Sequence, residues 1–314
     1  MNVANERKIC LAGGCFWGVQ GYFNRINGVL KSEVGYANGE GMAYYEGLKS
    51  SGHAEVIMLT YDSNILSLAE ILYRFISIID PTSLNRQGND IGTQYRSGIY
   101  YENKSDLTVI KAVLDTIKDK FNVPIMIECK RLENYTKAEE YHQNYLDKNP
   151  NGYCHINIFS ANEPLFITQK FKIYDDLKSR LSPLEYSITQ QNDTEQAFTS
   201  PLYEEKSEGL YVDITSGEPL FSSMDKFNSG TGWPSFTKPI STTSLAYFED
   251  FTHGLKRVEV RAKRSNSHLG HVFDDGMASR GGLRYCINGA SLNFIPKNSL
   301  KELGYAEFEP FLMK

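Results

Sequence analysis

Apolar residues in the first half of the chain follow helical and strand spacings in turn. A helix is predicted to begin just after Cys15, because apolar residues recur there three and four positions apart. These residues are Phe16, Val19, Tyr22, Phe23 and Ile26. The same spacings predict strands over 8–12, 55–61, 98–102 and 124–132, and helices over 66–79, 105–121 and 136–148. This mixture predicts an α/β or α+β sandwich.

The pattern changes beyond about Phe159. Two short helices are predicted over 175–181 and 185–191, on either side of Ser182 and Pro183. From Gly209 onward, short apolar runs are interrupted by Gly, Pro and Ser, which predicts a mostly-β half. No internal repeat relates the two halves, so the chain is predicted to join two different domains, 1–159 and 176–314, through a linker over 160–175.

Length and charge agree with two globular domains and exclude some partners. The chain has 314 residues, against roughly 150 residues per domain. A net charge of −5 and the lack of a long basic run argue against nucleic acid or an anionic membrane as a partner. No apolar run reaches the roughly 20 residues of a membrane span, and the first residues lack the apolar core of a secretory signal. We therefore expect a cytoplasmic protein.

Five cysteines are too few and too scattered for a disulfide framework, so we expect them to be catalytic or buried. Cys15 stands out, because it lies between a glycine pair and the start of a predicted helix. A cysteine attacks as its thiolate, and a helix N-terminus stabilises an anion by only about 0.3–1 kcal/mol, less than one pKa unit. Other groups must therefore supply the rest, while Phe16 and Trp17 would suit a methyl group.

Three other segments of this half carry candidate chemistry. Glu55 stands at the start of a predicted strand, Asp90 and Tyr95 lie in a polar loop over 88–97, and Cys154 is a second thiol on a predicted turn. Each fragment alone also fits a buried cysteine or an ordinary surface acid. Their joint occurrence favours a thiol active site.

Together these segments resemble methionine sulfoxide reductase A over nearly all of residues 8–158. The motifs that carry the resemblance are Gly14-Cys15-Phe16-Trp17-Gly18, Val34-Gly35-Tyr36-Ala37, Gly52-His53-Ala54-Glu55, 88–101 and 150–154. The resemblance implies an α+β fold, an α/β sandwich with a ferredoxin-like core. It also implies that Cys15 attacks the sulfoxide sulfur while Glu55 donates a proton to the oxygen.

The resemblance assigns supporting roles as well. Tyr95 and an upstream tyrosine would hydrogen-bond the sulfoxide oxygen, and we choose Tyr45 for the upstream position, with Tyr44 as the alternative. Asp90 would support the site, and Cys154 would condense with the Cys15 sulfenic acid to a disulfide. The remaining two thiols, Cys10 and Cys129, are expected to be buried spectators in strands.

The chemistry of sulfoxide reduction imposes one requirement that does not depend on the resemblance. Sulfoxide oxygen leaves poorly unless it is protonated, so a neutral acid must stand beside it at working pH. Glu55 must therefore be at least partly buried, with a raised pKa.

The second thiol site centres on Cys286. Strand alternation predicts Arg284, Cys286 and Asn288 on one face, where the guanidinium would favour the thiolate. Alternation would place His268 and His271 on opposite faces, but Gly270 permits a bulge that brings them together. Zinc binding is the competing explanation for the histidine pair. Trp233, after a glycine turn, offers an aromatic wall.

This half resembles methionine sulfoxide reductase B over about 176–314. The resemblance rests on 220–223, 229–236, 257–261, 268–275 and 284–296. It implies a mostly-β, partly open barrel with Cys286 as nucleophile, His271 as the favoured proton donor and His268 assisting. The other implied roles are methyl binding by Trp233, tuning of charge by Asp275 and Arg284, and orientation of the ring groups by Asn288.

Two departures from that family carry information. The usual zinc-binding cysteines are replaced by Asp213, Ser216, Ala262 and Ser265, so we expect no metal. Thr231 stands where relatives often carry a resolving cysteine. The Cys286 sulfenic acid is therefore expected to be reduced by an external thiol or by a cysteine of the other domain.

The two resemblances imply a bifunctional reductase of free and peptide-bound methionine sulfoxide, the first domain acting on the S-epimer and the second on the R-epimer. No cofactor is expected, and electrons would come from thioredoxin or an equivalent thiol reductant. A cysteine-based peroxide or disulfide oxidoreductase is the alternative, although no C-x-x-C pair is present. A half that only recognises oxidised methionine is a second alternative.

Overall fold

The computed structural model describes residues 4–118, 120–150, 152, 154–163, 165, 171, 174–254 and 256–313. The chain forms two compact units, Glu6–Glu163 and Pro164–Lys314. Much of the predicted linker over 160–175 lies outside the described residues, so the proposed domain limits stay a prediction.

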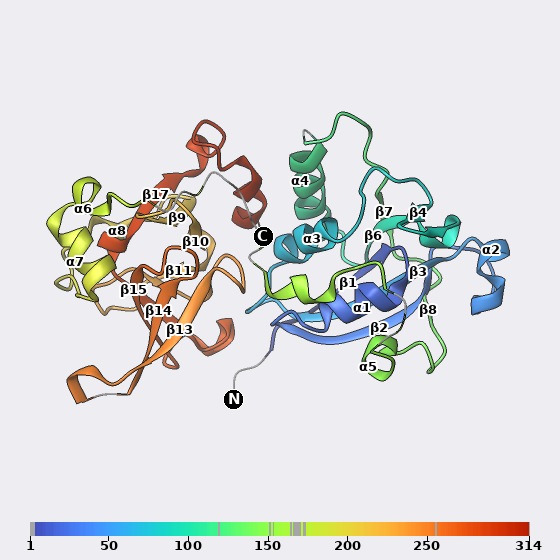
Figure 1. Ribbon diagram of the computed structural model, residues 1–314, viewed down its shortest axis with the longest axis horizontal. Coiled ribbons are helices and arrows are strands. Elements are labelled where there is room, and N and C mark those ends of the chain that lie inside the picture. The colour runs from blue at the N-terminus through green and yellow to red at the C-terminus, as the bar shows by residue number, and fades with distance from the viewer. Residues whose placement is uncertain are drawn as a thin grey trace. The chain divides into compact units, whose positions relative to one another are not determined.

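The first unit is a mixed α/β domain built on one six-stranded sheet (Figure 1). The strands in their spatial order are β7 (Glu128–Arg131), β6 (Ser97–Tyr101), β1 (Glu6–Gly13), β3 (Ala54–Asp62), β2 (Val29–Ala37) and β8 (Thr136–Lys137). A separate small hairpin pairs β4 (Arg86–Gln87) with β5 (Asp90–Ile91). The helices are α1 (Phe16–Phe23), α2 (Leu48–Ser51), α3 (Leu68–Ser77), α4 (Asp106–Lys118) and α5 (Tyr145–Lys148), with single 3-10 turns η1 (Tyr45–Gly47), η2 (Thr93–Tyr95) and η3 (Ile158–Asn162).

Helices cover one face of this sheet and loops cover the other. At the end of β1, a Cβ added to Gly13 would lie 2.7 Å from Phe75 of α3 and 3.4 Å from Val19 of α1. The opposite face carries small residues such as Cys10 and Ala12, over which Tyr135 packs. Residues two apart in a strand share a face. The helical side of the sheet therefore also carries Leu11 and the residues paired with it on β3 and β6. Cys10 is therefore buried within a strand, as predicted.

The helix predicted over 136–148 is wrong. Thr136 and Lys137 instead pair as β8 with Tyr36 and Gly35 of β2. The Gln143 side chain then binds both backbone groups of Val34, which holds the following segment as a loop. Only α5, at the end of the segment, is helical. The predicted strand over 124–132 is likewise shorter, since regular pairing is confined to β7.

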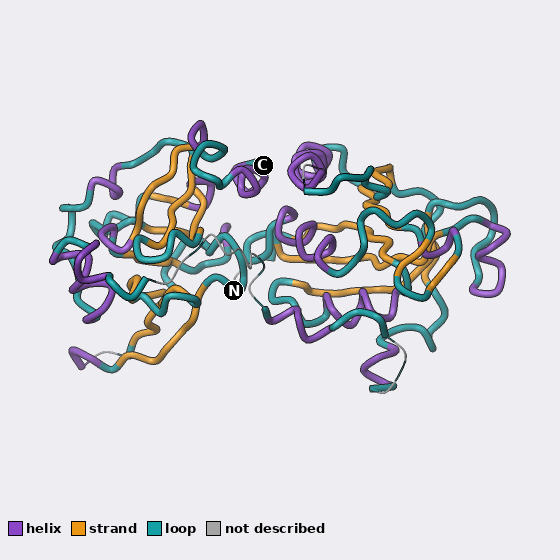
Figure 2. The backbone as a smooth tube through the Cα atoms, turned by 45° about the horizontal axis from the view of Figure 1, so that its top comes forward, coloured by secondary structure: helices purple, strands orange, loops and turns teal. Residues whose placement is uncertain are grey.

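The second unit is mostly β and entirely antiparallel, with short helices only, as Figure 2 shows. A three-stranded sheet has the order β10 (Pro219–Ser222), β9 (Gly209–Asp213) and β17 (Leu292–Pro296). A six-stranded sheet has the order β11 (Lys226–Phe227), β12 (Ser235–Phe236), β16 (Arg284–Ile287), β15 (His268–Phe273), β14 (Arg257–Ala262) and β13 (Leu245–Asp250). Among the described residues this sheet ends at β11 and β13, so it does not close into a barrel.

The two sheets of the second unit share one apolar core. Tyr211 and Phe221 of the smaller sheet pack with Phe236, Val260 and Ile287 of the larger one. Helices α6 (Leu177–Arg180), α7 (Pro183–Gln191) and α8 (Pro201–Glu204) precede the strands, and α7 begins two residues before the predicted 185, because Ser182 and Glu185 form a full capping box at its N-terminus. The remaining regular pieces are 3-10 turns: η4 (Ser223–Asp225), η5 (Thr252–Gly254), η6 (Ala278–Arg280), η7 (Gly289–Ser291), η8 (Lys297–Ser299) and η9 (Ala306–Leu312).

Candidate active sites

Cys15 caps the N-terminus of α1, directly after β1 ends. Gly14 makes the turn possible, because its φ is +80° and an added Cβ would lie 2.5 Å from Gln87. The backbone N–H groups of Trp17 and Gly18 lie near the Cys15 sulfur and lower its pKa. Burial, followed by the nearby Glu55, has the larger opposite effect, so the pKa is raised well above its ordinary value. The resting group is a thiol.

Glu55 lies on β3, on the helical side of the sheet, and is only 2% exposed. Its Oε2 accepts a hydrogen bond of 3.1 Å from the backbone N–H of Phe16, which ties it to the start of α1. Burial raises the pKa of Glu55 to about 8, with the Phe16 N–H opposing the change and Asp90 adding to it. The predicted burial and raised pKa are therefore confirmed, and Glu55 is mostly protonated at pH 7.

Two tyrosines lie beside this acid. The hydroxyls of Tyr45, in η1, and Tyr95, in η2, hydrogen-bond each other. Burial, and then Glu55, raise the pKa of both, which keeps them neutral donors. Tyr44 is 53% exposed and its ring lies against Gly47 instead. Of the two tyrosines that the sequence left open, the structure thus brings Tyr45 to the site.

Trp17 is held by groups that the sequence did not single out. Its ring stacks on Tyr145, with centroids 3.8 Å apart, and its indole N–H donates to Nδ1 of His142 at 3.1 Å. The imidazole of His142 in turn lies 5.1 Å from the Phe16 ring and 4.6 Å from the Tyr45 ring. His142 falls inside the helix that spacing wrongly predicted, where it would have been an ordinary surface residue.

Cys154 lies over the first turn of α1. A Cβ added to Gly18 would be 2.9 Å from the Cys154 sulfur, and that sulfur hydrogen-bonds the Ile156 carbonyl at 3.1 Å. A cavity of about 440 Å³ opens beside it, lined mainly by residues of 146–159. Asp90 faces the neighbouring His155, with carboxylate oxygen and ring nitrogen 3.5 Å apart. Cys15 and Cys154 therefore lie at the two ends of one helical turn.

In the second unit, Cys286 lies in the middle of the larger sheet. Register pairs it with Ser235 on one side and with His271 on the other, and His271 with Glu259 beyond. Directly paired residues share a face, so these four side chains form one row. The alternate residues, such as Tyr285, belong to the core behind the sheet.

A bulge brings the two histidines together. Register shifts within β15, where Leu269 is the additional residue, and the rings of His268 and His271 end 5.7 Å apart. Gly270 has φ +152°, and an added Cβ would lie 2.1 Å from the Cys286 carbonyl oxygen. The bulge predicted from Gly270 is confirmed.

Each imidazole has a carboxylate partner that the sequence analysis did not name. His271 Nε2 lies 2.7 Å from Asp250, and His268 Nδ1 lies 2.5 Å from Glu259. Burial lowers the pKa of both histidines, while these carboxylates partly oppose it. Arg257 also binds Asp250, at 2.7 Å. Asp250 reaches His271 from another strand, so only the fold reveals the pair.

Charged and hydroxyl groups surround the Cys286 sulfur. Thr231 Oγ1, at the position for which the resemblance implied a resolving cysteine in relatives, lies 3.8 Å away. Arg284 binds the thiol and also holds Asp275 through two contacts of 2.8 Å. Burial raises the pKa of Cys286, and Thr231 and Arg284 only partly oppose this. The predicted influence of the guanidinium is present, but burial outweighs it.

Trp233 is fixed through Glu195, a second residue that sequence analysis missed. The indole N–H donates to the Glu195 carbonyl at 3.1 Å, and the Glu195 N–H donates to Asn288 Oδ1 at 3.0 Å. The Glu195 carboxylate accepts the backbone N–H groups of Gly289 and Ala290 at 2.5 and 2.8 Å. Asn288, one residue beyond β16, thus supports the indole through Glu195.

Comparison with known families identifies both units. The model of the peptide methionine sulfoxide reductase family matches residues 7–173. The chain belongs to the peptide methionine sulfoxide reductase family. The SelR domain model matches residues 181–296, so the protein joins a methionine sulfoxide reductase A domain, the S-epimer class, to a methionine sulfoxide reductase B domain, the R-epimer class.

Solved structures of such reductases are similar to the chain. Reduced Mxr1 from Saccharomyces cerevisiae is 36% identical and aligns over 48% of this chain and 88% of that one, with a TM-score of 0.46. Methionine sulfoxide reductase A of Corynebacterium diphtheriae is 30% identical over 48% and 78%, with a TM-score of 0.43. Mxr1 in complex with Trx2 is 25% identical over 45% and 84%, with a TM-score of 0.33.

In the reductase B domain, three of the four residues that the sequence analysis compared with zinc-binding cysteines, Asp213, Ser216 and Ser265, belong to one hydrogen-bonded network of carboxylate and hydroxyl groups. The Asp213 carboxylate accepts from Thr215 and Ser216 at 2.6 and 2.7 Å. The Thr215 hydroxyl also hydrogen-bonds the Ser267 hydroxyl at 2.7 Å, and the Ser265 hydroxyl donates to that of Ser267 at 3.0 Å. This network links the end of β9 to the turn before β15. Within the described ranges, no three His, Cys, Asp or Glu side chains are grouped to hold a metal ion.

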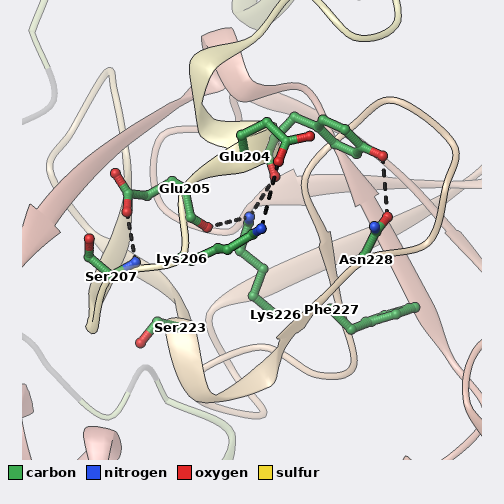
Figure 3. Close-up of a pocket in the computed structure, with 9 residues that line it drawn as sticks. Glu204, Glu205, Lys206, Ser207, Ser223, Lys226, Phe227 and Asn228 are labelled. Atoms are coloured by element: carbon green, nitrogen blue, oxygen red, sulfur yellow. Dashed lines mark hydrogen bonds and ion pairs between the residues drawn. The ribbon is translucent and has the colours of Figure 1, made fainter.

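A pocket of about 230 Å³ lies elsewhere in the reductase B domain (Figure 3). Its central cation, Lys226, donates to the carbonyls of Tyr203 and Glu205 at 2.9 and 2.7 Å, which closes the end of α8. The Tyr203 hydroxyl donates to Asn228 Oδ1 at 3.2 Å. Neither Cys286 nor the histidines line it, so this pocket is not the reaction site. Through the part of the chain that is described, no helix has the length and apolarity that crossing a membrane requires.

Proposed function

We propose that the two domains reduce the two epimers of methionine sulfoxide, free or in peptides, with separate nucleophiles: Cys15 for the S-epimer and Cys286 for the R-epimer. The observation that carries the proposal is Glu55, a buried carboxyl with its pKa raised to about 8, bonded to the first N–H of the helix that Cys15 caps. An acid that stays protonated at neutral pH is what the departing sulfoxide oxygen needs.

In the first domain, the Cys15 sulfur attacks the sulfoxide sulfur while Glu55 gives its proton to the oxygen. Tyr45 and Tyr95, kept neutral, hydrogen-bond that oxygen, and Phe16 and Trp17 receive the methyl group. The backbone N–H groups of Trp17 and Gly18 stabilise the sulfur as it gives up its proton. The sulfur–oxygen bond breaks and the oxygen leaves as water. Water then attacks the Cys15 sulfur and breaks its new bond to the substrate sulfur, and methionine leaves with Cys15 as a sulfenic acid and the released proton back on Glu55.

Recycling of the first domain proceeds through Cys154. Its thiol attacks the Cys15 sulfenic acid, which forms a disulfide and releases water; Asp90 supports both thiols through His155. A dithiol then reduces this disulfide, so each turnover consumes two thiol hydrogens and yields methionine and water. Thioredoxin is the reductant that we propose.

In the second domain, Cys286 attacks and an imidazole delivers the proton. We assign this to His271, with His268 assisting, because Asp250 and Glu259 stabilise each ring when it carries the positive charge. Trp233 receives the methyl group, held by Glu195 and Asn288. Arg284 and Asp275 set the charge at the sulfur. An external thiol then reduces the Cys286 sulfenic acid, since no other cysteine lies in this domain.

The finer assignments of fold and place belong to the same proposal. We assign the first domain, 1–159, to the α/β sandwiches with a ferredoxin-like core and the second, 176–314, to the partly open barrels, joined by 160–175. A cytoplasmic location is supported by the five unpaired cysteines, which suit a reducing compartment.

Enantiopure substrates test the proposal. Cys15→Ser is expected to abolish S-epimer reduction and spare the R-epimer, and Cys286→Ser to do the reverse. Each variant is the folding control for the other, because the untouched domain keeps its activity. Loss of both activities in one single variant, or survival of the matched activity, would refute separate nucleophiles.

A further inference from the structure

The only two tryptophans of the chain are anchored by different kinds of acceptor. The Trp233 indole donates to a backbone carbonyl, that of Glu195, which carries no titratable proton. The Trp17 indole donates to Nδ1 of His142 instead. A carbonyl accepts at every pH, whereas an imidazole nitrogen accepts only while it is unprotonated. The two methyl-binding rings therefore differ in their response to acid.

The contacts of His142 define its proton. Because Nδ1 accepts from Trp17, the neutral ring must carry its hydrogen on Nε2. The side chain is 1% exposed, and Nε2 is buried without a hydrogen-bond partner, 4.0 Å from the Glu139 carboxylate. No contact of the ring calls for a second proton.

Groups from several elements face this imidazole. Glu139 and Glu46 favour its protonated form, but burial has the larger effect and lowers the pKa of His142 below its usual 6.5. Glu139 is itself engaged by the hydroxyl of Tyr36 at 2.6 Å. The aromatic neighbours Phe16, Trp17, Tyr45 and Tyr141 bring no positive charge. The ring is neutral at pH 7, and acid must force a proton onto it.

We propose that His142 is a positioning residue for the S-epimer site: its neutral imidazole fixes the Trp17 indole as the methyl-binding wall, and protonation of His142 releases that wall. This inference rests on the proposed role of Trp17. Protonated Nδ1 would point an N–H at the indole N–H, so the two donors would repel and Trp17 would keep only its stack on Tyr145. The Tyr45 ring also packs on His142, so the imidazole joins the methyl wall to the oxygen-binding side.

Two substitutions separate the acceptor from the ring. His142→Asn places an amide oxygen near the position of Nδ1 and cannot titrate, whereas His142→Phe keeps an aromatic ring and removes the acceptor. At pH 7 we expect His142→Phe to lower kcat/KM for the S-epimer about fivefold, the factor for one lost hydrogen bond, with the change mainly in KM. His142→Asn is expected to stay within about twofold of the native enzyme.

The pH profile is the decisive readout. For the S-epimer, native kcat/KM is expected to fall as the pH drops below 6.5, and His142→Asn is expected to remove the part of that fall due to His142. The R-epimer profile must be identical in native and variant chains, because its indole acceptor does not titrate. An unchanged acid limb in His142→Asn would overturn the proposal.

Fluorescence tests the positioning without any turnover. In a Trp233→Phe background, Trp17 is the only tryptophan, and its emission is expected to change over the same pH range and to lose this change in His142→Asn. Emission that ignores pH with His142 present would contradict the inference. If instead Cys15→Ser still reduced the S-epimer, the proposed function would fail while this optical result stood.

Discussion

The first site stabilises its sulfur with backbone groups, and the second does so with side chains. Two N–H groups at the start of α1 face Cys15, whereas Arg284 and Thr231 face Cys286 in the middle of a sheet. Burial outweighs both arrangements and keeps both groups as thiols. Backbone donors are kept by most substitutions, whereas the donors at the second sulfur are lost when Arg284 or Thr231 is replaced.

The proton donors differ in the same manner. The first site has one carboxyl that burial keeps protonated, and the second has two imidazoles whose pKa burial lowers while a carboxylate partner of each opposes the change. Loss of a proton with rising pH therefore removes the acid of the first site near pH 8. The two activities should separate under mutation and under pH, and the following experiments use one as the control for the other.

The largest effect is expected from Glu55→Gln. The amide can still accept the Phe16 N–H, but it cannot deliver a proton, so S-epimer kcat/KM should fall roughly 10²- to 10⁴-fold. Steady-state assays with each epimer measure this, and the R-epimer rate should be unchanged. An S-epimer rate within threefold of native would exclude Glu55 as the acid.

Gly270→Ala should damage only the second domain. Its φ of +152° and the 2.1 Å approach to the Cys286 carbonyl leave no room for a methyl group, and the backbone strain alone costs about 1–3 kcal/mol. Thermal unfolding should show a lower Tm for one transition, with R-epimer turnover reduced. Gly254→Ala is the matched control, because its φ is also positive but its Cβ would meet nothing within 4 Å. If both variants lower the Tm and the R-epimer turnover equally, the close approach of Gly270 to the Cys286 carbonyl is not the cause.

The pH dependence above neutrality should distinguish the two acids. Since the pKa of Glu55 is raised to about 8, it is protonated below that pH and loses its proton above it, so the rise of S-epimer kcat/KM that comes from ionisation of Cys15 should level off above about pH 8. Ionisation of the Cys15 thiol alone would keep raising the rate above that pH. An S-epimer profile that continues to rise there would therefore contradict the assignment.

The smallest effect is expected from Thr231→Cys, which tests how the two domains differ in the regeneration of their nucleophiles. Thr231 Oγ1 lies 3.8 Å from the Cys286 sulfur, so Thr231→Cys places a thiol within reach for a disulfide. One equivalent of R-sulfoxide should then produce a Cys286 disulfide, detected by peptide mass mapping, and a modest gain in thioredoxin-coupled turnover. Thr231→Ser is the control. If the Thr231→Cys variant yields only the Cys286 sulfenic acid and no disulfide, the two sulfur atoms are too far apart to react.

Local signals were enough for the elements that begin each site. The helix after Cys15, the burial of Glu55 and the bulge at Gly270 follow from spacing, from the chemistry of the oxygen and from a residue that tolerates positive φ. Each of these depends on a few neighbouring residues.

The residues that hold the indoles could not be predicted in the same manner. His142 meets Trp17 only because Gln143 binds the edge of β2 and keeps its segment out of a helix, and Asn144 adopts a left-handed φ of +51°. Glu195 and Asp250 likewise act on residues far away in sequence. Such partners are fixed by packing between elements, and no periodicity in the sequence encodes them.

The network around Asp213 has a consequence for an enzyme that works where oxidants accumulate. Thiolates that coordinate zinc can themselves be oxidised, and the zinc site is then lost. Carboxylate and hydroxyl oxygens have no such chemistry, so the tie between Asp213, Thr215 and Ser267 keeps its bonds in the peroxide that damages methionine. The hydrogen bonds that stabilise this part of the domain are thus insensitive to the oxidants that create its substrate.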